Sequence, residues 1–178
     1  MAEPSVAQLF LDSTAKSIAT AQANNGMGGL GDFPPDGEYN VRVLKIILGE
    51  TTFRTKTGDV PAGKIQFQYE EVTASPGRSA PREFFGSPFI FPKDASQVTD
   101  AGNKTRINID MERLQGHLSV INGSPCTDIR QGLQAAIDKV NSVATEVVLR
   151  ATSRPNPKNA ANPYRTEFLT ANLSQATA

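Results

Sequence analysis

Features that would indicate disulfide bonding, metal binding or membrane insertion are scarce in this sequence. The 178 residues include one cysteine, Cys126, which excludes an internal disulfide and by itself cannot form a zinc site. No apolar run approaches the roughly 18 residues that a membrane-spanning helix needs. No charged N-terminal stretch precedes a hydrophobic block, as it would in a signal peptide. We therefore expect an intracellular protein that does not enter a membrane.

An excess of charge of one sign is also absent. Lys plus Arg and Asp plus Glu number 18 each, so the formal net charge at pH 7 is zero. Any binding to nucleic acid must then depend on local clusters of cations and not on the charge of the whole protein. A chain of this length suits one domain that buries about two thirds of its unfolded surface.

Residues suited to catalysis do not form a recognisable pattern. His117 is the only histidine and lies in a helical repeat, so we expect it at a helix surface and not as a general base. Cys126 has no clear base partner, and we expect an inert thiol. Asp110 and Glu112 do not share a helix face, and no acids have the spacing of a metal site. The sequence predicts no enzyme activity, cofactor or metal.

Three segments have the composition of β-strands. Residues 39–48 alternate apolar and polar side chains, but the alternation shifts by one residue midway, which predicts a β-bulge or a strongly coiled strand. Residues 64–70 alternate cleanly and present one apolar face. Residues 82–91 are apolar on both faces, although a small sheet needs only one aromatic face for its core. The second face of this strand therefore needs another explanation.

Two helical repeats and two further strands follow. Apolar residues recur at helical spacing over residues 107–121 and again over residues 129–140. Residues 146–152 and 167–173 are the fourth and fifth predicted strands. The expected fold is therefore mainly β with helices (α+β), with a two-helix segment between strands three and four. This is the element order of a five-stranded OB-fold barrel, whose first strand is long and bent.

The N-terminal residues are expected to form an arm outside this domain. Residues 4–23 carry a short apolar stripe and predict a helix that docks on the domain or on a partner, including a second copy of the chain. Residues 24–37 are rich in glycine and proline and suit turns, but they lack the Lys-Ser/Thr pair of a P-loop. The expected organisation is an arm and connector over residues 1–36, one domain over residues 37–174 and a short tail over residues 175–178.

Two predicted loops combine cations with an aromatic ring. They cover residues 49–63 and 153–165, and in an OB-fold barrel these two loops border the ligand groove on the face of strands two and three. Binding of single-stranded DNA without sequence preference needs cations for the phosphates and flat rings on which bases stack. The stacking candidates are Phe53, Tyr69, Phe84 and Tyr164, and the phosphate candidates are Arg54, Lys56, Arg82, Arg150, Arg154, Lys158 and Arg165.

Four stretches add a resemblance to a known family. They are residues 34–43, residues 64–69, the helical segment that ends at Asn122-Gly123, and residues 147–150 before the Asn-rich loop. Over residues 34–174 the chain resembles bacteriophage single-stranded DNA-binding proteins of the OB-fold type. The resemblance implies a protein that coats and protects single-stranded DNA during phage replication or recombination in the cytoplasm of the bacterial host. It also implies phage or host replication and recombination proteins as partners.

Two other functions fit the same pattern. A phage virion or assembly protein could use the barrel as a scaffold and the N-terminal arm to contact neighbouring subunits, which the zero net charge also suits. An OB-type subunit could instead bind protein or RNA. Salt-sensitive binding to unstructured DNA would separate DNA binding from the assembly role, and competition by matched RNA would separate it from the third function.

Overall fold

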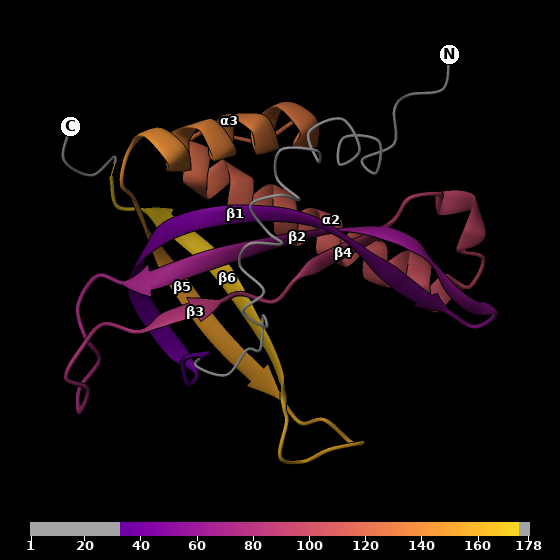
Figure 1. Ribbon diagram of the computed structural model, residues 1–178, viewed down its shortest axis with the longest axis horizontal. Helices are drawn as coiled ribbons and strands as arrows, with labels where there is room; N and C mark the ends of the chain where they lie inside the picture. Colours follow the sequence, from indigo (N-terminus) through magenta and orange to yellow (C-terminus); the bar gives the residue numbers. More distant parts are fainter. Residues whose placement is uncertain (1–32, 175–178) are drawn as a thin grey trace.

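A long antiparallel hairpin is the largest element of the fold. The computed structural model describes residues 33–174, so the predicted arm helix over residues 4–23 and the tail over residues 175–178 lie outside the described residues. β1 (Gly37–Thr55) and β2 (Gly58–Glu71) pair from Val41 to the turn at Lys56 and Thr57. The far end of this hairpin extends beyond the other strands, beside the start of helix α2 (Figure 1).

The prediction of a long loop over residues 49–63 is wrong. These residues form the end of β1, a tight turn and the start of β2. Thr51 pairs with Ala62 there, and further out Phe53 pairs with Val60. The Phe53 ring is buried with Ala62 and Val98 in a second, smaller hydrophobic cluster. The outer part of the hairpin therefore has apolar contacts of its own, which offset the entropy of ordering the chain.

The predicted irregularity in the first strand is confirmed. The register between β1 and β2 shifts between Val43 and Lys45. One extra residue reverses the faces of a strand, so Val41 and Val43 before the shift and Leu48 after it all reach the core. The strand can then pair with two neighbours, β2 along its outer part and β5 (Thr145–Arg154) along its first seven residues, Gly37 to Val43.

The strand predicted over residues 82–91 divides into two short strands. β3 (Glu83–Phe85) and β4 (Phe89–Pro92) both pair with β2, on either side of a break at Gly86. The described residues thus form six strands, not the five expected, in the order β3-β2-β1-β5-β6, with β4 also beside β2. The last strand is β6 (Tyr164–Asn172), and all pairs are antiparallel.

The sheet is open, so the strands do not close into the OB-fold-like barrel expected from the sequence. Within the described residues, no backbone ladder joins β6 to β3 or β4. Side chains bridge the two edges instead: the Ser87 amide donates to Oε2 of Glu167 at 2.8 Å, and the Ser87 hydroxyl donates to the Arg165 carbonyl. At the same place the Phe33 ring packs edge-on against Phe84, with ring centroids 5.7 Å apart. We call this junction the seam.

Both predicted helices are confirmed. α2 (Ala101–Asn122) begins after the Asp100 cap, before the predicted start at residue 107, and α3 (Ile129–Ser142) follows the Asp128 cap. α2 ends at Gly123, whose φ of 68° lies in the left-handed region that glycine tolerates best. No helix in the described part of the chain is long and apolar enough to cross a membrane.

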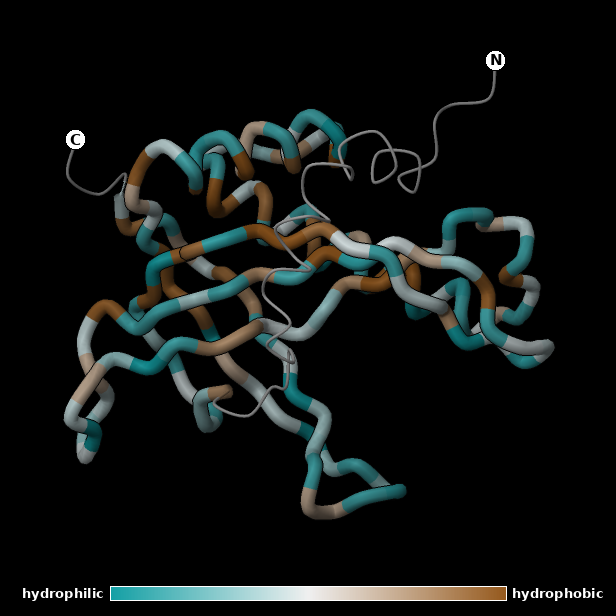
Figure 2. Tube along the Cα trace, in the orientation of Figure 1, coloured by the Kyte–Doolittle hydropathy of each residue, from teal (hydrophilic) through white to brown (hydrophobic). Residues whose placement is uncertain are grey.

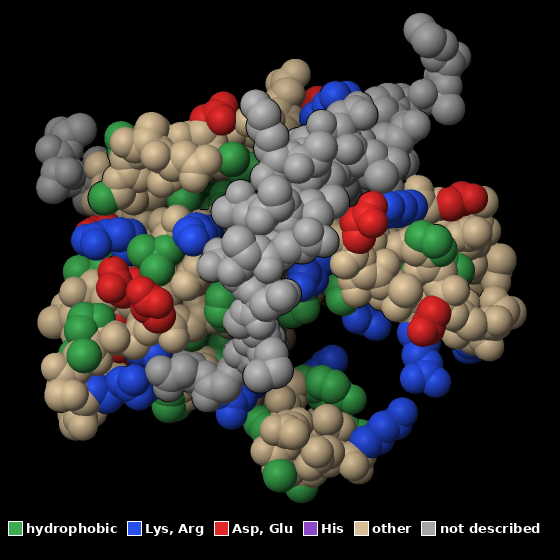
Figure 3. Space-filling model, in the orientation of Figure 1, with side chains coloured by type: hydrophobic (Ala, Val, Ile, Leu, Met, Phe, Trp, Pro, Cys, Tyr) green, Lys and Arg blue, Asp and Glu red, His purple; other side chains and the backbone are tan. Residues whose placement is uncertain are grey.

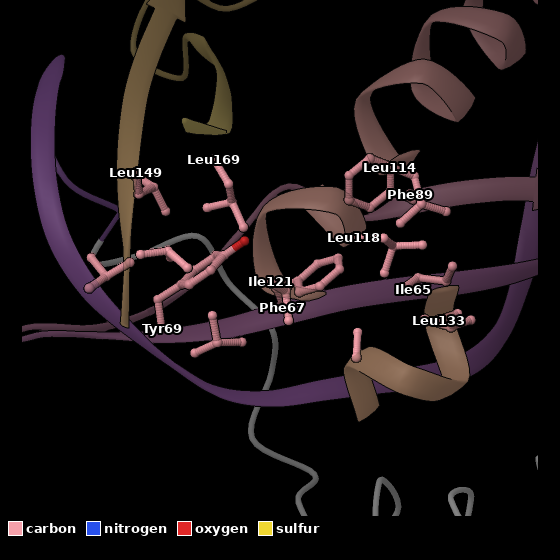
Figure 4. Close-up of a cluster of buried hydrophobic side chains, with 14 of the residues drawn as sticks. Ile65, Phe67, Tyr69, Phe89, Leu114, Leu118, Ile121, Leu133, Leu149 and Leu169 are labelled. Atoms are coloured by element: carbon pink, nitrogen blue, oxygen red, sulfur yellow. The ribbon is translucent and has the colours of Figure 1, made fainter. Parts of the chain in front are cut away.

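The main core lies between the sheet and the two helices. The hydrophobic stretches of the chain concentrate there, whereas the loops at the ends of the sheet are mostly hydrophilic or neutral (Figure 2). Side chains from the strands and from both helices point toward one another in this layer (Figure 4). The central members are Ile65, Phe67, Phe89, Leu114, Leu118, Ile121, Leu133 and Leu149.

Candidate nucleic-acid interface

Three of the four rings proposed for base stacking are buried. Phe53 is 2% exposed, Phe84 3% and Tyr69 not at all. Tyr69 and Phe84 pack on each other in the main core, with ring centroids 5.4 Å apart. The expectation that these rings face a ligand is therefore wrong. Alternation alone could not decide the matter for Phe84, because its strand is apolar on both faces.

Tyr164 is the stacking candidate that lies at the surface. It is 43% exposed and stands at the start of β6, beside the β5–β6 loop. Arg154 lies directly opposite it in the strand register, and the guanidinium carbon is 5.1 Å from the ring centroid. A cation over a ring is attracted by the negative face of the π-system, so this contact holds the ring and the cation together at the surface.

Two of the seven phosphate candidates are engaged in the fold. Arg82 is 8% exposed, and its Nη1 lies 3.9 Å from Oε1 of the buried Glu71. Arg165 is half-buried at the seam and donates from Nη1 to the Phe33 carbonyl at 3.1 Å. Arg82 is therefore wrong as a phosphate ligand at the surface, whereas the role of Arg165 stays a prediction. The exposed candidates are Arg54, Lys56, Arg150, Arg154 and Lys158.

Four of the five exposed candidates lie at two projecting elements, and Arg150 lies further back on β5. Arg54 and Lys56 lie at the end of the β1–β2 hairpin, and Lys158 lies in the loop between β5 and β6, next to Arg154 and Tyr164. The outline of the molecule is concave between these two elements, and Lys or Arg side chains border the hollow on both sides (Figure 3). The two groups that the sequence assigned to one groove therefore project on either side of a common hollow.

The β5–β6 side of this hollow is the more strongly positive. Residues 145–174 contain four cations and two acids, of which Glu167 is fully buried and Glu146 pairs with Arg42 at 3.0 Å. At the hairpin end, by contrast, Asp59 lies opposite Arg54 in the register. A hydrogen bond from the Asn103 amide, assisted by the charge of Lys56, lowers the pKa of Asp100, so this carboxylate stays charged near Lys56.

Phe168 is a surface ring that is not among the stacking candidates predicted from the sequence. It is 37% exposed on β6, between the buried Glu167 and Leu169. Its position in the alternation is the signal that could have identified it. The signal was weak because Phe168 and Leu169 are adjacent and both apolar, so that the sequence does not show which of them faces the core.

A cluster of buried polar residues lies at the seam and includes His117, which was expected at a helix surface. That expectation is wrong, since His117 is 1% exposed. His117 Nε2 lies 3.7 Å from Oε1 of Glu167, and Arg113 Nη1 lies 3.7 Å from Oε2. Burial by itself raises the pKa of Glu167, but His117, Arg113 and the Ser87 amide together hold it below its usual value.

The other groups considered for chemistry are poorly placed for it. The Tyr69 hydroxyl is buried near Glu167, and burial, followed by that negative charge, raises the pKa of Tyr69 well above its usual value. Burial and then the charge of Asp128 raise the pKa of the Cys126 thiol, which disfavours the reactive thiolate. Among residues 33–174, no three His, Cys, Asp or Glu side chains are grouped so that they could hold a metal ion.

Comparisons with known proteins do not identify a family for this chain. No protein-family model, no curated protein and no solved structure matches it.

Proposed function

We propose that this protein binds single-stranded DNA, largely without sequence preference, through an OB-fold-like domain. If β3 and β4 are counted as one interrupted strand, the element order matches that of the OB-fold, a partly open five-stranded barrel. In the proposed role the protein coats and protects DNA during phage replication or recombination. It would act in the cytoplasm of the bacterial host, with replication or recombination proteins as partners.

The observation that supports DNA binding most directly is the hollow between the hairpin end and the β5–β6 loop (Figure 3). Cations project from both elements, and an exposed tyrosine, Tyr164, lies beside the loop. Phosphates are attracted by such cations, and a base can stack on the tyrosine ring at about 1–3 kcal/mol. Of the two acids in residues 145–174, Glu167 is buried and Glu146 is paired with Arg42, which limits their repulsion of phosphates.

A salt series on a labelled oligothymidine tests the proposal. Fluorescence anisotropy at about 50 and 200 mM salt should show binding that weakens as salt rises, because each phosphate contact contributes about −0.7 to the slope of log K against log salt. Duplex DNA added as a competitor should displace little of the oligothymidine. No binding at the lower salt concentration would contradict the proposal and favour the virion or assembly alternative.

Charge removal on the β5–β6 side sharpens the test. The double variant Arg154→Ala/Lys158→Ala should bind on the order of tenfold more weakly, with a salt slope shallower by up to about 1.4, because two phosphate contacts are lost. Arg130→Ala is the control for each of the two single variants, Arg154→Ala and Lys158→Ala, since Arg130 is an exposed cation on α3, which lies on the opposite side of the molecule from the β5–β6 loop (Figure 1). Equal weakening by the control would mean that the attraction is not local to the hollow.

A further inference from the structure

The outer face of the β5–β6 hairpin carries a ladder of arginines, threonines and aromatic rings. Residues on one face of a strand alternate with those on the other, and the core side of this hairpin holds buried residues such as Ala151 and Leu169. The outward-facing ladder consists of three directly opposed pairs: Arg150 with Phe168, Thr152 with Thr166, and Arg154 with Tyr164. We call these six residues the stacking ladder.

Each arginine of the stacking ladder lies over the ring opposite to it. The guanidinium carbon of Arg150 is 5.8 Å from the Phe168 ring centroid, and that of Arg154 is 5.1 Å from the Tyr164 centroid. Both distances are within the range in which a cation and an aromatic face attract each other. Within the described residues neither arginine forms an ion pair; the nearest carboxylate in the register is that of Glu38, opposite Arg150 on β1.

Tyr164 and Phe168 are exposed, so packing in the core does not account for the presence of aromatic rings at these positions. In the described part of the chain the exposed large hydrophobic residues are Val72, Ile109, Val143, Tyr164 and Phe168. The two aromatic members of this set both lie on the stacking ladder, whereas the three aliphatic ones are scattered over other elements. Because β6 is an edge of the sheet that residues 33–174 form, no paired strand among these residues lies beside Tyr164 or Phe168 on the side away from β5.

The spacing of the rings favours an unpaired, extended strand. Phe168 lies four positions after Tyr164 in the sequence, which corresponds to about 13 Å along a β-strand. Neighbouring bases in a stacked strand are only about 3.4 Å apart, so the two rings would contact bases that are not stacked neighbours. In a duplex both faces of each base are already covered by the stack. The stacking ladder therefore suits single-stranded nucleic acid and not duplex DNA.

We propose that the stacking ladder is a second part of the DNA-binding site, which takes the bases of an extended single strand. Phe168 and Tyr164 each stack on one base, and Arg150 and Arg154 contact the phosphates between them. Between the two stacking positions lie Thr166 and Thr152, whose hydroxyl donates to the Thr166 carbonyl at 3.3 Å. The strand continues past Tyr164 to Lys158 and the hollow. The inference rests on the proposed function and adds to it a path along the outside of β5–β6.

Tryptophan reporters test the path directly, because the sequence contains no tryptophan. Phe168→Trp and Tyr164→Trp each introduce a single indole on the stacking ladder, and stacking on a base should quench its fluorescence. Both variants should be quenched by oligothymidine over the concentration range in which anisotropy reports binding. Val143→Trp is the matched control: Val143 is 54% exposed and lies before β5, at the end away from the loop. Its fluorescence should not change.

Removal of the Phe168 ring measures how much this ring contributes to the affinity for oligothymidine. Phe168→Ala should weaken oligothymidine binding by roughly fivefold to a hundredfold, the usual loss for one stacked base, and Phe168→Tyr should restore it because the ring is kept. Val143→Ala should bind as the wild type does. Since Phe168 faces outward, circular dichroism of Phe168→Ala should match that of the wild type.

The possible failures can be told apart. If anisotropy shows binding but the tryptophan of Phe168→Trp is not quenched and Phe168→Ala binds normally, the stacking ladder is not part of the site, and the proposed function stands. If neither the wild-type protein nor any variant binds oligothymidine, the proposed function is wrong as well. If the indole of Phe168→Trp changes with protein concentration alone, the ladder is a contact between copies of the chain, and the inference is overturned.

Discussion

Among single residues, Gly86 shows most clearly how the seam restricts the sequence. The break between β3 and β4 lies at this glycine, and its amide donates to the Phe67 carbonyl at 2.9 Å. A Cβ atom at this position would lie 2.1 Å from Oε1 of Glu167 and 2.9 Å from Cε2 of Tyr69. Both neighbours are buried side chains that have little room to move.

Gly86→Ala should therefore destabilise the protein. The added methyl group must push the Glu167 carboxylate away from the Ser87 amide, at a cost of about 1–3 kcal/mol from overpacking, with a further loss from the buried hydrogen bond. Gly116→Ala is the matched control, because nothing lies within 4 Å of its Cβ position on α2. That variant should be neutral or stabilised by up to about 1 kcal/mol. Urea unfolding followed by circular dichroism measures both, and equal midpoints would contradict the role of Gly86.

At the scale of elements, the outer part of the β1–β2 hairpin is the least expected feature. It pairs in register to the turn, but its apolar contacts are limited to the small cluster of Phe53, Ala62 and Val98. Val60, Ile90 and the start of α2 pack against this cluster, and Arg106 of α2 lies 5.5 Å from the Phe53 ring centroid. Phe53 is the largest side chain in this cluster, so we expect it to contribute most to the order of the hairpin end.

Phe53→Ala should loosen the hairpin end without unfolding the main core. Loss of a buried phenylalanine costs about 3–5 kcal/mol where the surroundings cannot collapse, and here that loss falls on one local cluster. Amide hydrogen exchange should become faster in residues 50–62 and stay slow in residues 64–69, which pair within the main sheet. Thr52→Ala, a change at an exposed position of the same strand, is the control. Uniformly faster exchange over both stretches would show that the two clusters unfold together.

At the scale of the whole molecule, the seam joins the two ends of the sheet through charge. Glu167 of β6 accepts the Ser87 amide from the β3–β4 connection and lies between His117 and Arg113 of α2. The Nδ1 atom of His117 contacts the Arg113 carbonyl at 3.0 Å and must donate to it, because a carbonyl only accepts. Protonation of the Glu167 carboxylate would remove the charge that holds these three elements together.

Stability should accordingly fall in acid. The folded pKa of Glu167 is lowered from 4.5, so its stabilising contribution is fully present above about pH 4.5 and is lost as pH falls through the folded value. Urea midpoints measured from pH 7 to pH 3 should therefore decrease. Glu167→Gln should be less stable than the wild type at pH 7. It should also lose less stability on acidification, since it has no carboxylate to protonate at this position.

Glu71 should contribute to the dependence of stability on pH that remains in Glu167→Gln. Burial tends to raise the pKa of Glu71, but hydrogen bonds from Ser75 and Arg82 outweigh it and lower the value. Glu83→Gln, at an exposed carboxylate on β3, should keep the wild-type pH dependence. An identical decrease in Glu167→Gln and the wild type would mean that the charge of Glu167 does not stabilise the seam.

Most secondary structure could be predicted because it depends on local patterns. The helical repeats, the Asp128 cap, the stop at Gly123 and the register shift near Leu44 all lie within a few residues of the features that cause them. The outer hairpin could not be predicted in this way. Residues 49–63 by themselves have the composition of a polar loop. Phe53 is buried there because it packs in one cluster with Val98, which is distant in the sequence.

The candidate site was predicted by type of residue more reliably than by position. The sequence by itself determined that cations outnumber acids near the C-terminus and that helices lie between the third and fourth strand segments, because composition and periodicity are properties of the chain alone. Only the tertiary structure decided which rings are buried. It placed Phe53, Tyr69 and Phe84 inside and left Tyr164 and Phe168 outside, because burial depends on which face of each strand the rest of the chain covers.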